Sequence, residues 1–393
     1  MLVSRSSTGT AMAALLAAFF SFQLWAADPA PADYRSQHFV LHTDLSADDA
    51  QALLDECEAM YGYLASYFNR RAPGLIECYV VDSLERWPES GLDPRGRQAV
   101  ELGAGTTLTH TVRSRGTFRA TSVVYAAAVS GSAKHEVVYA FCRHAFAEVG
   151  PLWYAEGMAE MGQYWKEGQL GVDCDEAIAR HLRESEPRPL AEILAMDVRS
   201  GENYGWAWSL CHLLAGNPNY QERFSRWGQN VLARKPIKFE QTFGRQLEQI
   251  EFEHRLLLTH LERGYRVDLC AWDWETKFAR PQTGAKLECE VVAARGWQAT
   301  GWKLAAGDRL VYRASGSWQL APGRRATAAG ISGGQGRLTA VLLADGKLGE
   351  PFPLGQTGGV TVPAPGELFV RCGDAWNELS DNSGSIKLTL EMR

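Results

Sequence analysis

The hydrophobic pattern changes near residue 268, and this change restricts the possible folds more than any other feature of the chain. Before it, apolar residues recur at helical spacing, whereas short alternating runs separated by Gly and Pro follow from Leu287 onward. Side chains repeat every 3.6 residues on a helix and every 2 on a strand, so the two halves need different elements. A chain of 393 residues also exceeds the usual size of one core. We therefore expect two domains, at residues 34–265 and 285–393.

The first domain is predicted to be α+β, with strands ahead of most of its helices. β-Branched and aromatic runs predict strands at 38–43, 76–81 and 118–127. Helical spacing predicts helices at 46–68, 133–147, 153–165, 204–214, 220–232 and 247–261. Ser46 and Asp49 have the spacing of a capping box, which marks the start of the first helix. This order of elements is typical of helices packed against a sheet.

The N-terminal segment has the pattern of an export signal. Arg5 is the only charged residue before an apolar run from Ala11 to Phe22, and Ala26 and Ala27 form a small-residue cleavage site. The apolar run is short for a membrane span, although an uncleaved anchor is the alternative. We expect residues 1–27 to be a signal peptide, and the mature protein to be secreted or periplasmic without a membrane span.

Charge and cysteine content narrow the possible functions. The net charge of −6 is spread without long runs, and nothing in this pattern indicates the basic face that nucleic-acid binding needs. None of the eight cysteines forms a Cys-x-x-Cys pair, which argues against a cysteine zinc site. In an exported chain an even number of cysteines permits disulfides, and Cys270 with Cys289 is the best candidate pair. Buried free thiols are the alternative.

Two segments in consecutive predicted helices indicate chemistry. They are His-Glu-Val-Val-Tyr from His135 and Trp-Tyr-Ala-Glu-Gly-Met-Ala-Glu from Trp153. Two His side chains four residues apart lie on one helix face and can bind one zinc ion, while the Glu after the first His activates water. Glu156 follows His135 by 21 residues, a gap that suits a turn between two antiparallel helices.

These segments resemble those of the gluzincin, or clan-MA-like, zinc metallopeptidases, and the resemblance spans roughly residues 34–265. It implies that His135 and Glu156 bind zinc and that Glu136 is the general base. It also places Tyr204 on a helix that lines the cleft, where it would polarise the substrate carbonyl. The implied activity is hydrolysis of a peptide or protein substrate by metal-activated water.

Tyr139 departs from this pattern because it stands where the second His is expected. A phenol must lose a proton with an ordinary pKa of about 10 before it binds zinc, although a bound cation favours that loss. Three interpretations stay open. Tyr139 binds zinc as phenolate, or Glu160 completes the zinc shell, or the domain is a catalytically inactive pseudo-peptidase that binds a carbohydrate or another partner.

The second domain is predicted to be an all-β sandwich. Alternating runs at 309–314, 338–342 and 386–390 are separated by Gly and Pro turns, as in sandwiches of roughly 100 residues. Oxygen-bearing side chains gather between Gly373 and Ser385, before the last predicted strand. Calcium prefers such ligands, although each of these residue types also suits a plain turn.

This loop resembles that of the calcium-dependent galactophilic bacterial lectins, whose fold is a galactose-binding-type sandwich. The resemblance implies that Asp374, Asp381 and Asn382 bind Ca²⁺ through side-chain oxygens and that Glu378 contributes its backbone carbonyl. In those lectins the ion also contacts sugar hydroxyls, so the resemblance predicts a cell-surface carbohydrate as a partner. The whole chain is therefore expected to be a gluzincin-like domain followed by a lectin-like module.

Overall fold

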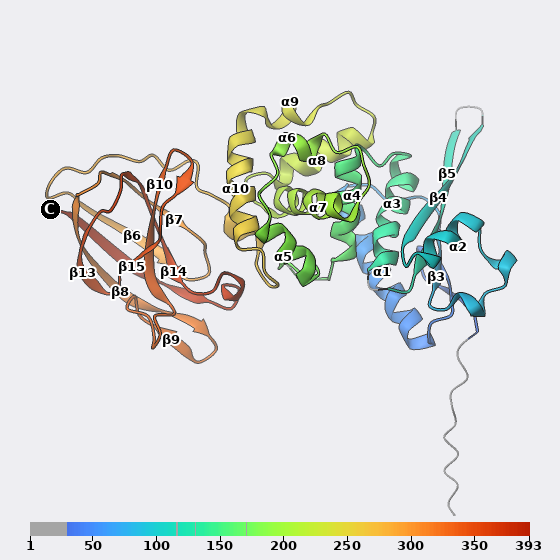
Figure 1. Ribbon diagram of the computed structural model, residues 1–393, viewed down its shortest axis with the longest axis horizontal. Helices are drawn as coiled ribbons and strands as arrows, with labels where there is room; N and C mark the ends of the chain where they lie inside the picture. The colour runs from blue at the N-terminus through green and yellow to red at the C-terminus, as the bar shows by residue number, and fades with distance from the viewer. Residues whose placement is uncertain (1–29, 115–116, 130, 170) are drawn as a thin grey trace, which may run out of the picture.

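The structure is a computed structural model that describes residues 30–114, 117–129, 131–169 and 171–393. The molecule is elongated, with a β-sheet region at one end, helices in the middle and a β-sandwich at the other end (Figure 1). This confirms an α+β N-terminal region followed by a β-sheet region. The predicted signal peptide lies outside the described residues. Within the described ranges, no helix is long and apolar enough to cross a membrane.

The N-terminal region contains one five-stranded sheet in the order β1-β2-β3-β5-β4. Its strands are β1 (Ala32–Arg35), β2 (Phe39–Thr43), β3 (Ile76–Val81), β4 (Gly105–Ser114) and β5 (Thr117–Ala127). Strands β2, β3 and β5 are parallel, and β1 and β4 run antiparallel at the two edges. The three central strands were predicted from their sequences. The two edge strands were not, because they are short or polar and lack an alternating apolar pattern.

Helices cover both faces of this sheet, as the alternation of its side chains requires. Cys78 and Val124 point toward α1 (Ala47–Tyr67) and α3 (Ser132–Phe146) in the main core. Val81 and Tyr125 point the other way, into a small core under α2 (Pro94–Glu101). Ser46 caps α1 by accepting a hydrogen bond of 3.2 Å from the Asp49 amide, which confirms the predicted helix start.

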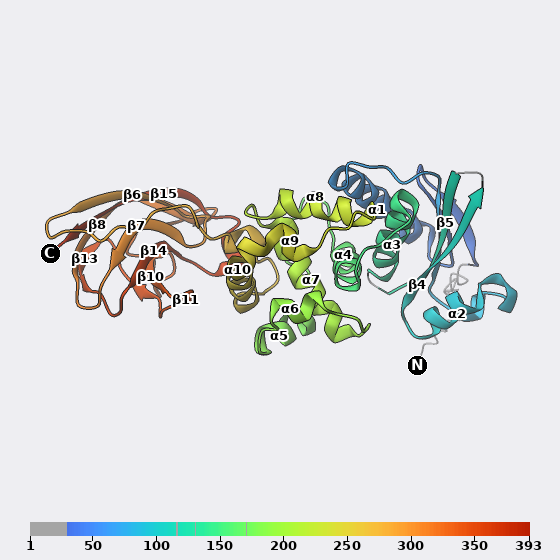
Figure 2. The same ribbon diagram turned by 90° about the horizontal axis from the view of Figure 1, so that it is seen from above.

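The middle of the molecule is helical. Its helices are α4 (Leu152–Gln163), α5 (Glu176–Glu184), α6 (Leu190–Leu194), α7 (Gly201–Gly216), α8 (Gln221–Leu232), α9 (Phe239–Phe243) and α10 (Leu247–Thr259). The six helices predicted from periodicity correspond to α1, α3, α4, α7, α8 and α10. Helices α2, α5, α6 and α9 were missed, because they span only two turns or so. Helix α4 lies between α3 and α7 (Figure 2).

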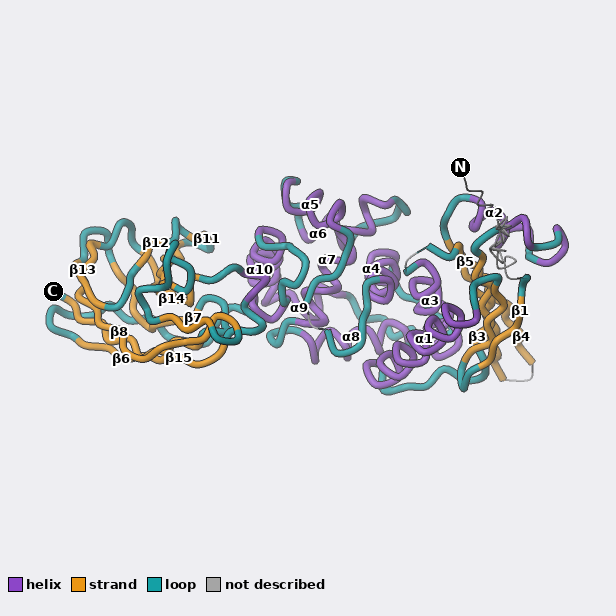
Figure 3. Tube along the Cα trace, turned by 90° about the horizontal axis from the view of Figure 1, so that it is seen from below, coloured by secondary structure: helices purple, strands orange, loops and turns teal. Residues whose placement is uncertain are grey.

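The C-terminal region is a sandwich of two antiparallel sheets (Figure 3). One sheet has the order β11-β10-β14-β7 with β12 beside β10, and the other has the order β13-β8-β15-β6 with β9 beside β8. The strands are β6 (Lys286–Val292), β7 (Gln298–Leu304), β8 (Arg309–Ala321), β9 (Arg324–Ala326), β10 (Arg337–Ala344), β11 (Lys347–Leu348), β12 (Phe352–Pro353), β13 (Thr357–Thr361), β14 (Gly366–Gly373) and β15 (Ser383–Met392). The three alternating runs in the sequence form parts of β8, β10 and β15.

The junction between the helices and the sandwich is packed. Trp272 lies against Phe369, with ring centroids 4.1 Å apart, and Trp376 stacks on His260 at 4.4 Å. The buried core of the N-terminal region therefore continues into the sandwich. The domain limits at 265 and 285 remain a prediction, which limited proteolysis would test.

The predicted Cys270–Cys289 disulfide was wrong, because all eight cysteines are free thiols. The two residues belong to different cores. Cys270 is fully buried below the junction and donates its thiol hydrogen to the carbonyl of Val267 at 2.7 Å. Cys289 lies on β6 and packs against the interior of the sandwich. Burial raises the pKa of both thiols, as expected of thiols that pack as small apolar groups.

Glu253 on α10 is the centre of a hydrogen-bond network at the junction between the helices and the sandwich. Its side chain is fully buried, and Oε1 accepts hydrogen bonds from the Trp272 amide (2.8 Å) and Trp274 Nε1 (2.7 Å). The same oxygen accepts from Asn219 Nδ2 at 2.8 Å, and Oε2 accepts from Asn217 Nδ2 at 2.7 Å. One carboxylate thus ties α10 to the turn before α8 and to the connection with the sandwich.

We expect Glu253→Ala to lower the free energy of unfolding by about 3 kcal/mol, because it leaves several buried donors without an acceptor. Chemical denaturation of the full chain, followed by tryptophan fluorescence, measures this loss. Glu248→Ala is the matched control, since Glu248 is exposed on the same helix and its replacement should change stability by less than about 0.5 kcal/mol. Equal effects of the two substitutions would contradict the assigned role of Glu253.

Candidate functional site

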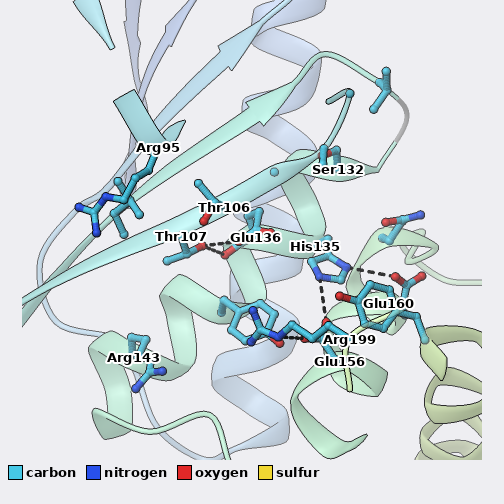
Figure 4. A pocket seen from close by; sticks show the side chains of 18 of the residues that line it. Arg95, Thr106, Thr107, Ser132, His135, Glu136, Arg143, Glu156, Glu160 and Arg199 are labelled. Atoms are coloured by element: carbon cyan, nitrogen blue, oxygen red, sulfur yellow. Dashed lines mark hydrogen bonds and ion pairs between the residues drawn. The ribbon is translucent and has the colours of Figure 1, made fainter. Parts of the chain in front are cut away.

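A cleft of about 610 Å³ opens between the edge strand β4 and the helices α3, α4 and α7. All six residues predicted for the N-terminal site line this cleft: His135, Glu136, Tyr139, Glu156, Glu160 and Tyr204. They come from three helices that are separate in the sequence, and the fold brings them into one place. Figure 4 labels four of them, His135, Glu136, Glu156 and Glu160. The cleft is therefore the candidate functional site.

Helix α3 carries the first three of these residues. It begins just after β5, where Gly131 takes a positive φ of 81°, so His135 and Glu136 lie in its first turns. His135 and Tyr139 are one turn apart on the same face, with ring centroids separated by 5.8 Å. Glu136 points instead toward β4, and its Oε2 accepts a hydrogen bond of 2.6 Å from Thr107 Oγ1.

Gly105 on β4 makes room for Glu136. A Cβ atom at residue 105 would lie 2.7 Å from Cγ of Glu136, which is closer than real Cβ contacts. The edge strand and the carboxylate therefore fit together only because this position has no side chain. Burial raises the pKa of Glu136, although the charge of His135 opposes the shift.

Helix α4 approaches its neighbours closely because it carries glycine on both sides. A side chain at Gly157 would collide with the backbone of Ala207 on α7, and one at Gly162 would collide with Val138 on α3. The Glu-Gly pair in the sequence motif therefore has a structural reason: the glycine seats α4 so that the preceding glutamate faces α3.

Two carboxylates from α4 flank His135 on its two ring nitrogens. Glu156 Oε2 lies 3.6 Å from Nε2, and Glu160 Oε1 lies 3.4 Å from Nδ1. Burial alone would lower the pKa of His135, but the two carboxylates outweigh it and raise the pKa to about 10. The imidazole is therefore protonated at neutral pH in this arrangement.

Two tyrosines complete the wall of the cleft. The hydroxyl of Tyr139 is buried and has no hydrogen-bond partner. Burial, and then the charge of Glu156, raise the pKa of Tyr139 well above its usual range. Tyr204 lies in the first turns of α7, with its ring centroid 6.3 Å from that of His135. Burial and Glu156 raise its pKa to about 12, so both phenols stay protonated at neutral pH.

Arg199 is a residue of this site that the sequence did not predict. Its Nε lies 2.9 Å from Glu156 Oε1, and its guanidinium carbon lies 5.9 Å from the centre of the Tyr139 ring. Arg199 precedes α7 in a segment without helical or strand periodicity, so no pattern in the sequence marks it. It is the second cation, after His135, that contacts Glu156.

These side chains, as arranged, do not fit a zinc ion. Two ligand atoms of one tetrahedral zinc lie about 3.3–3.5 Å apart, so His135 and Glu156 are close to a suitable spacing. Glu160 faces the other ring nitrogen, where it orients the imidazole and does not share an ion with Nε2. Tyr139 offers a neutral phenol. Among the described residues, no group of three or more His, Cys, Asp or Glu side chains is arranged to hold a metal ion.

The predicted calcium residues of the sandwich lie in the loop between β14 and β15. Asp374 Oδ1 accepts hydrogen bonds from Gln335 Nε2 (2.7 Å) and from the Ala375 amide (2.9 Å). Gln335 Nε2 also donates to Glu378 Oε2 at 3.4 Å, so one amide joins Asp374 and Glu378. Gln335 lies in a Gly-rich turn before β10, and sequence reasoning did not identify it.

Two buried oxygens in this loop lack a hydrogen-bond partner. They are Asp374 Oδ2 and Asn382 Oδ1. Buried oxygens of this kind normally bind a donor, an ordered water or an ion. Asp381, by contrast, is exposed. The donor types therefore suit Ca²⁺ at Asp374 and Asn382.

No family model matches the chain, and no curated protein matches it. Among solved structures, the EclA N-terminal domain, a PllA-like lectin, matches 27% of this chain and 96% of its own at 22% identity and a TM-score of 0.24. PliG from Aeromonas hydrophila, a periplasmic inhibitor of g-type lysozyme, matches 30% of this chain and 92% of its own at 13% identity and a TM-score of 0.18.

A metallopeptidase, IMPa from Pseudomonas aeruginosa in complex with an O-glycopeptide, also resembles part of the chain. It matches 61% of this chain but only 28% of its own length, at 12% identity and a TM-score of 0.19. The structural neighbours therefore match the two regions loosely.

We expect Tyr139→His to raise zinc affinity by at least about tenfold. An imidazole at this position binds zinc without the deprotonation that a phenol needs, and it would lie one turn from His135 on the same face of α3. Isothermal titration calorimetry with zinc measures the change. Tyr139→Phe is the matched control, because it removes only an unpartnered hydroxyl and should leave zinc affinity unchanged. Equal zinc binding by the two variants would show that residue 139 does not face the candidate metal position.

Proposed function

We propose that this chain is an exported pseudo-peptidase that binds an extended peptide in the cleft and a carbohydrate through its C-terminal module. The observation that carries this proposal is the free edge of β4 along the cleft. Residues 105–109 of β4 line the cleft, and in the described part of the chain β4 has a neighbouring strand on one side only.

The register of β4 determines which backbone groups face the cleft. The Ala127 amide donates to the carbonyl of Ala104 at 3.0 Å, so residue 104 faces β5. Hydrogen-bonded and non-bonded pairs alternate along an antiparallel ladder, and residues 105, 107 and 109 therefore turn their N–H and C=O groups outward. An extended peptide would add to this edge as a further strand, with the backbone supplying affinity.

The charged groups of the cleft support binding without hydrolysis. Thr107 holds Glu136, the predicted general base, by a hydrogen bond, and Arg199 pairs with Glu156. Tyr204 keeps its proton and can donate a hydrogen bond to a peptide carbonyl. A peptide in the cleft would thus meet hydrogen-bonding groups from both the strand and the helices.

A second function, zinc-dependent peptide hydrolysis, is favoured by the 3.6 Å spacing of His135 Nε2 and Glu156 Oε2. It requires that Arg199 leave Glu156, that His135 lose a proton and that a third ligand be found. Metal analysis separates the two functions. About one zinc per purified chain, lost on changing His135, supports hydrolysis, and purified protein without zinc supports peptide binding alone.

The peptide-binding proposal predicts that Thr109→Pro weakens binding about tenfold, the equivalent of one backbone hydrogen bond. Proline removes an N–H that faces the cleft and leaves the ladder with β5 intact. The probe is a library of capped octapeptides, selected on the full chain by affinity and mass spectrometry and then titrated individually.

Thr109→Val is the matched control for this experiment. Both substitutions remove the contact of 3.1 Å between the hydroxyls of Thr109 and Ser122, but only proline removes the N–H. Valine should therefore bind peptide like the wild type. The proposal fails if the wild type retains no peptide, or if the two variants bind equally.

Calcium binding by the C-terminal module can be tested by its effect on stability. If Asp374 Oδ2 and Asn382 Oδ1 bind Ca²⁺, calcium at a hundred times its Kd should stabilise the protein by about 2.7 kcal/mol. Thermal unfolding with and without calcium measures the shift. Asp374→Asn should abolish it, whereas Glu350→Gln, an exposed change in the same sandwich, should retain it. A shift that survives Asp374→Asn would place the ion elsewhere.

A further inference from the structure

Three buried carboxylates meet in the cleft, and each needs a partner. Glu136, Glu156 and Glu160 are 8%, 2% and 6% exposed. An ionised carboxylate removed from water is costly unless a hydrogen bond or a cation compensates it. Thr107 binds Glu136, and His135 faces Glu160 through Nδ1.

Among the three carboxylates, Glu156 has the weakest polar contacts with the motif helices α3 and α4. From α3, His135 Nε2 approaches it at 3.6 Å, which is long for a hydrogen bond, and the neutral hydroxyl of Tyr139 lies near it. The other oxygen, Oε1, is 2.9 Å from Nε of Arg199. The strongest polar contact of this buried group is therefore with a residue from outside the motif helices.

Arg199 reaches Glu156 from the open side of the cleft. Its side chain is 62% exposed, and it extends from the segment between α6 and α7. The guanidinium also lies near the face of the Tyr139 ring, at 5.9 Å from the centroid, where cations are attracted. In Figure 4 the labelled Arg199 lies beside Glu156, joined to it by a dashed line. It thus stands between residues 139 and 156, the two motif positions that would complete a metal shell with His135.

We infer that the Arg199 guanidinium is the resident cation of this cleft and that it competes with any metal ion for Glu156. An arginine keeps its charge at all relevant pH values, so it neutralises the carboxylate without an external ion. A zinc ion between His135 Nε2 and Glu156 Oε2 would share this carboxylate with the guanidinium on Oε1, and the two cations would repel each other. The inference rests on the proposed function, since it explains how a peptidase-like cleft is stable without metal.

The test removes the guanidinium and measures zinc affinity. Arg199→Ala should bind zinc at least about tenfold more tightly than the wild type in isothermal titration calorimetry of the full chain, because Glu156 then lacks its cation. Arg199→Lys should resemble the wild type, because it keeps the charge. Adding methylguanidinium to Arg199→Ala should weaken zinc binding again, since the small cation can refill the space beside Glu156.

Arg95→Ala is the matched control. Arg95 also lines the cleft, but it pairs with Asp93 at 3.4 Å, so its loss changes net charge equally without freeing Glu156. Equal zinc affinity in Arg199→Ala and the wild type overturns the inference, and so does an equal rise in Arg95→Ala. Neither result affects peptide binding along β4, which Thr109→Pro tests separately. Circular dichroism confirms that each variant is folded.

Discussion

The close packing of α4 between α3 and α7 is the contact on which the rest of the cleft depends. Gly157 and Gly162 let α4 approach both neighbours at van der Waals distance, so that Glu156 and Glu160 flank one imidazole. Larger residues at either glycine would separate the helices and move the carboxylates away from His135. The sequence motif is therefore as much a packing motif as a chemical one.

That packing buries three carboxylates, and other side chains of the same chain compensate their charges. Buried carboxylates usually need cations or several hydrogen bonds. Here the compensation comes from a protonated His135, from the Thr107 hydroxyl on the edge strand and from Arg199 in a connecting segment. Each of the three buried carboxylates therefore has a partner within the chain itself.

The sequence predicted the helices and strands in which apolar residues recur regularly, and it missed those without such a pattern. The three central strands, the long helices and the Ser46 cap follow from local periodicity and capping. Strand β4 was missed because a polar edge strand buries little and shows little alternation. Arg199 and Gln335 were missed because their partners are distant in the chain, and only the tertiary fold brings them together.

The packed junction gives the molecule a fixed length. Trp376 stacks on His260 and Arg371 lies 3.8 Å above the Trp376 ring, within a few residues of the loop that carries Asp374. The sandwich is therefore packed rigidly against the helical region and is not joined to it by a flexible linker. If the loop and the cleft both bind as proposed, the rigid junction would fix the distance and the angle between their two partners, and the protein would act as a molecular ruler.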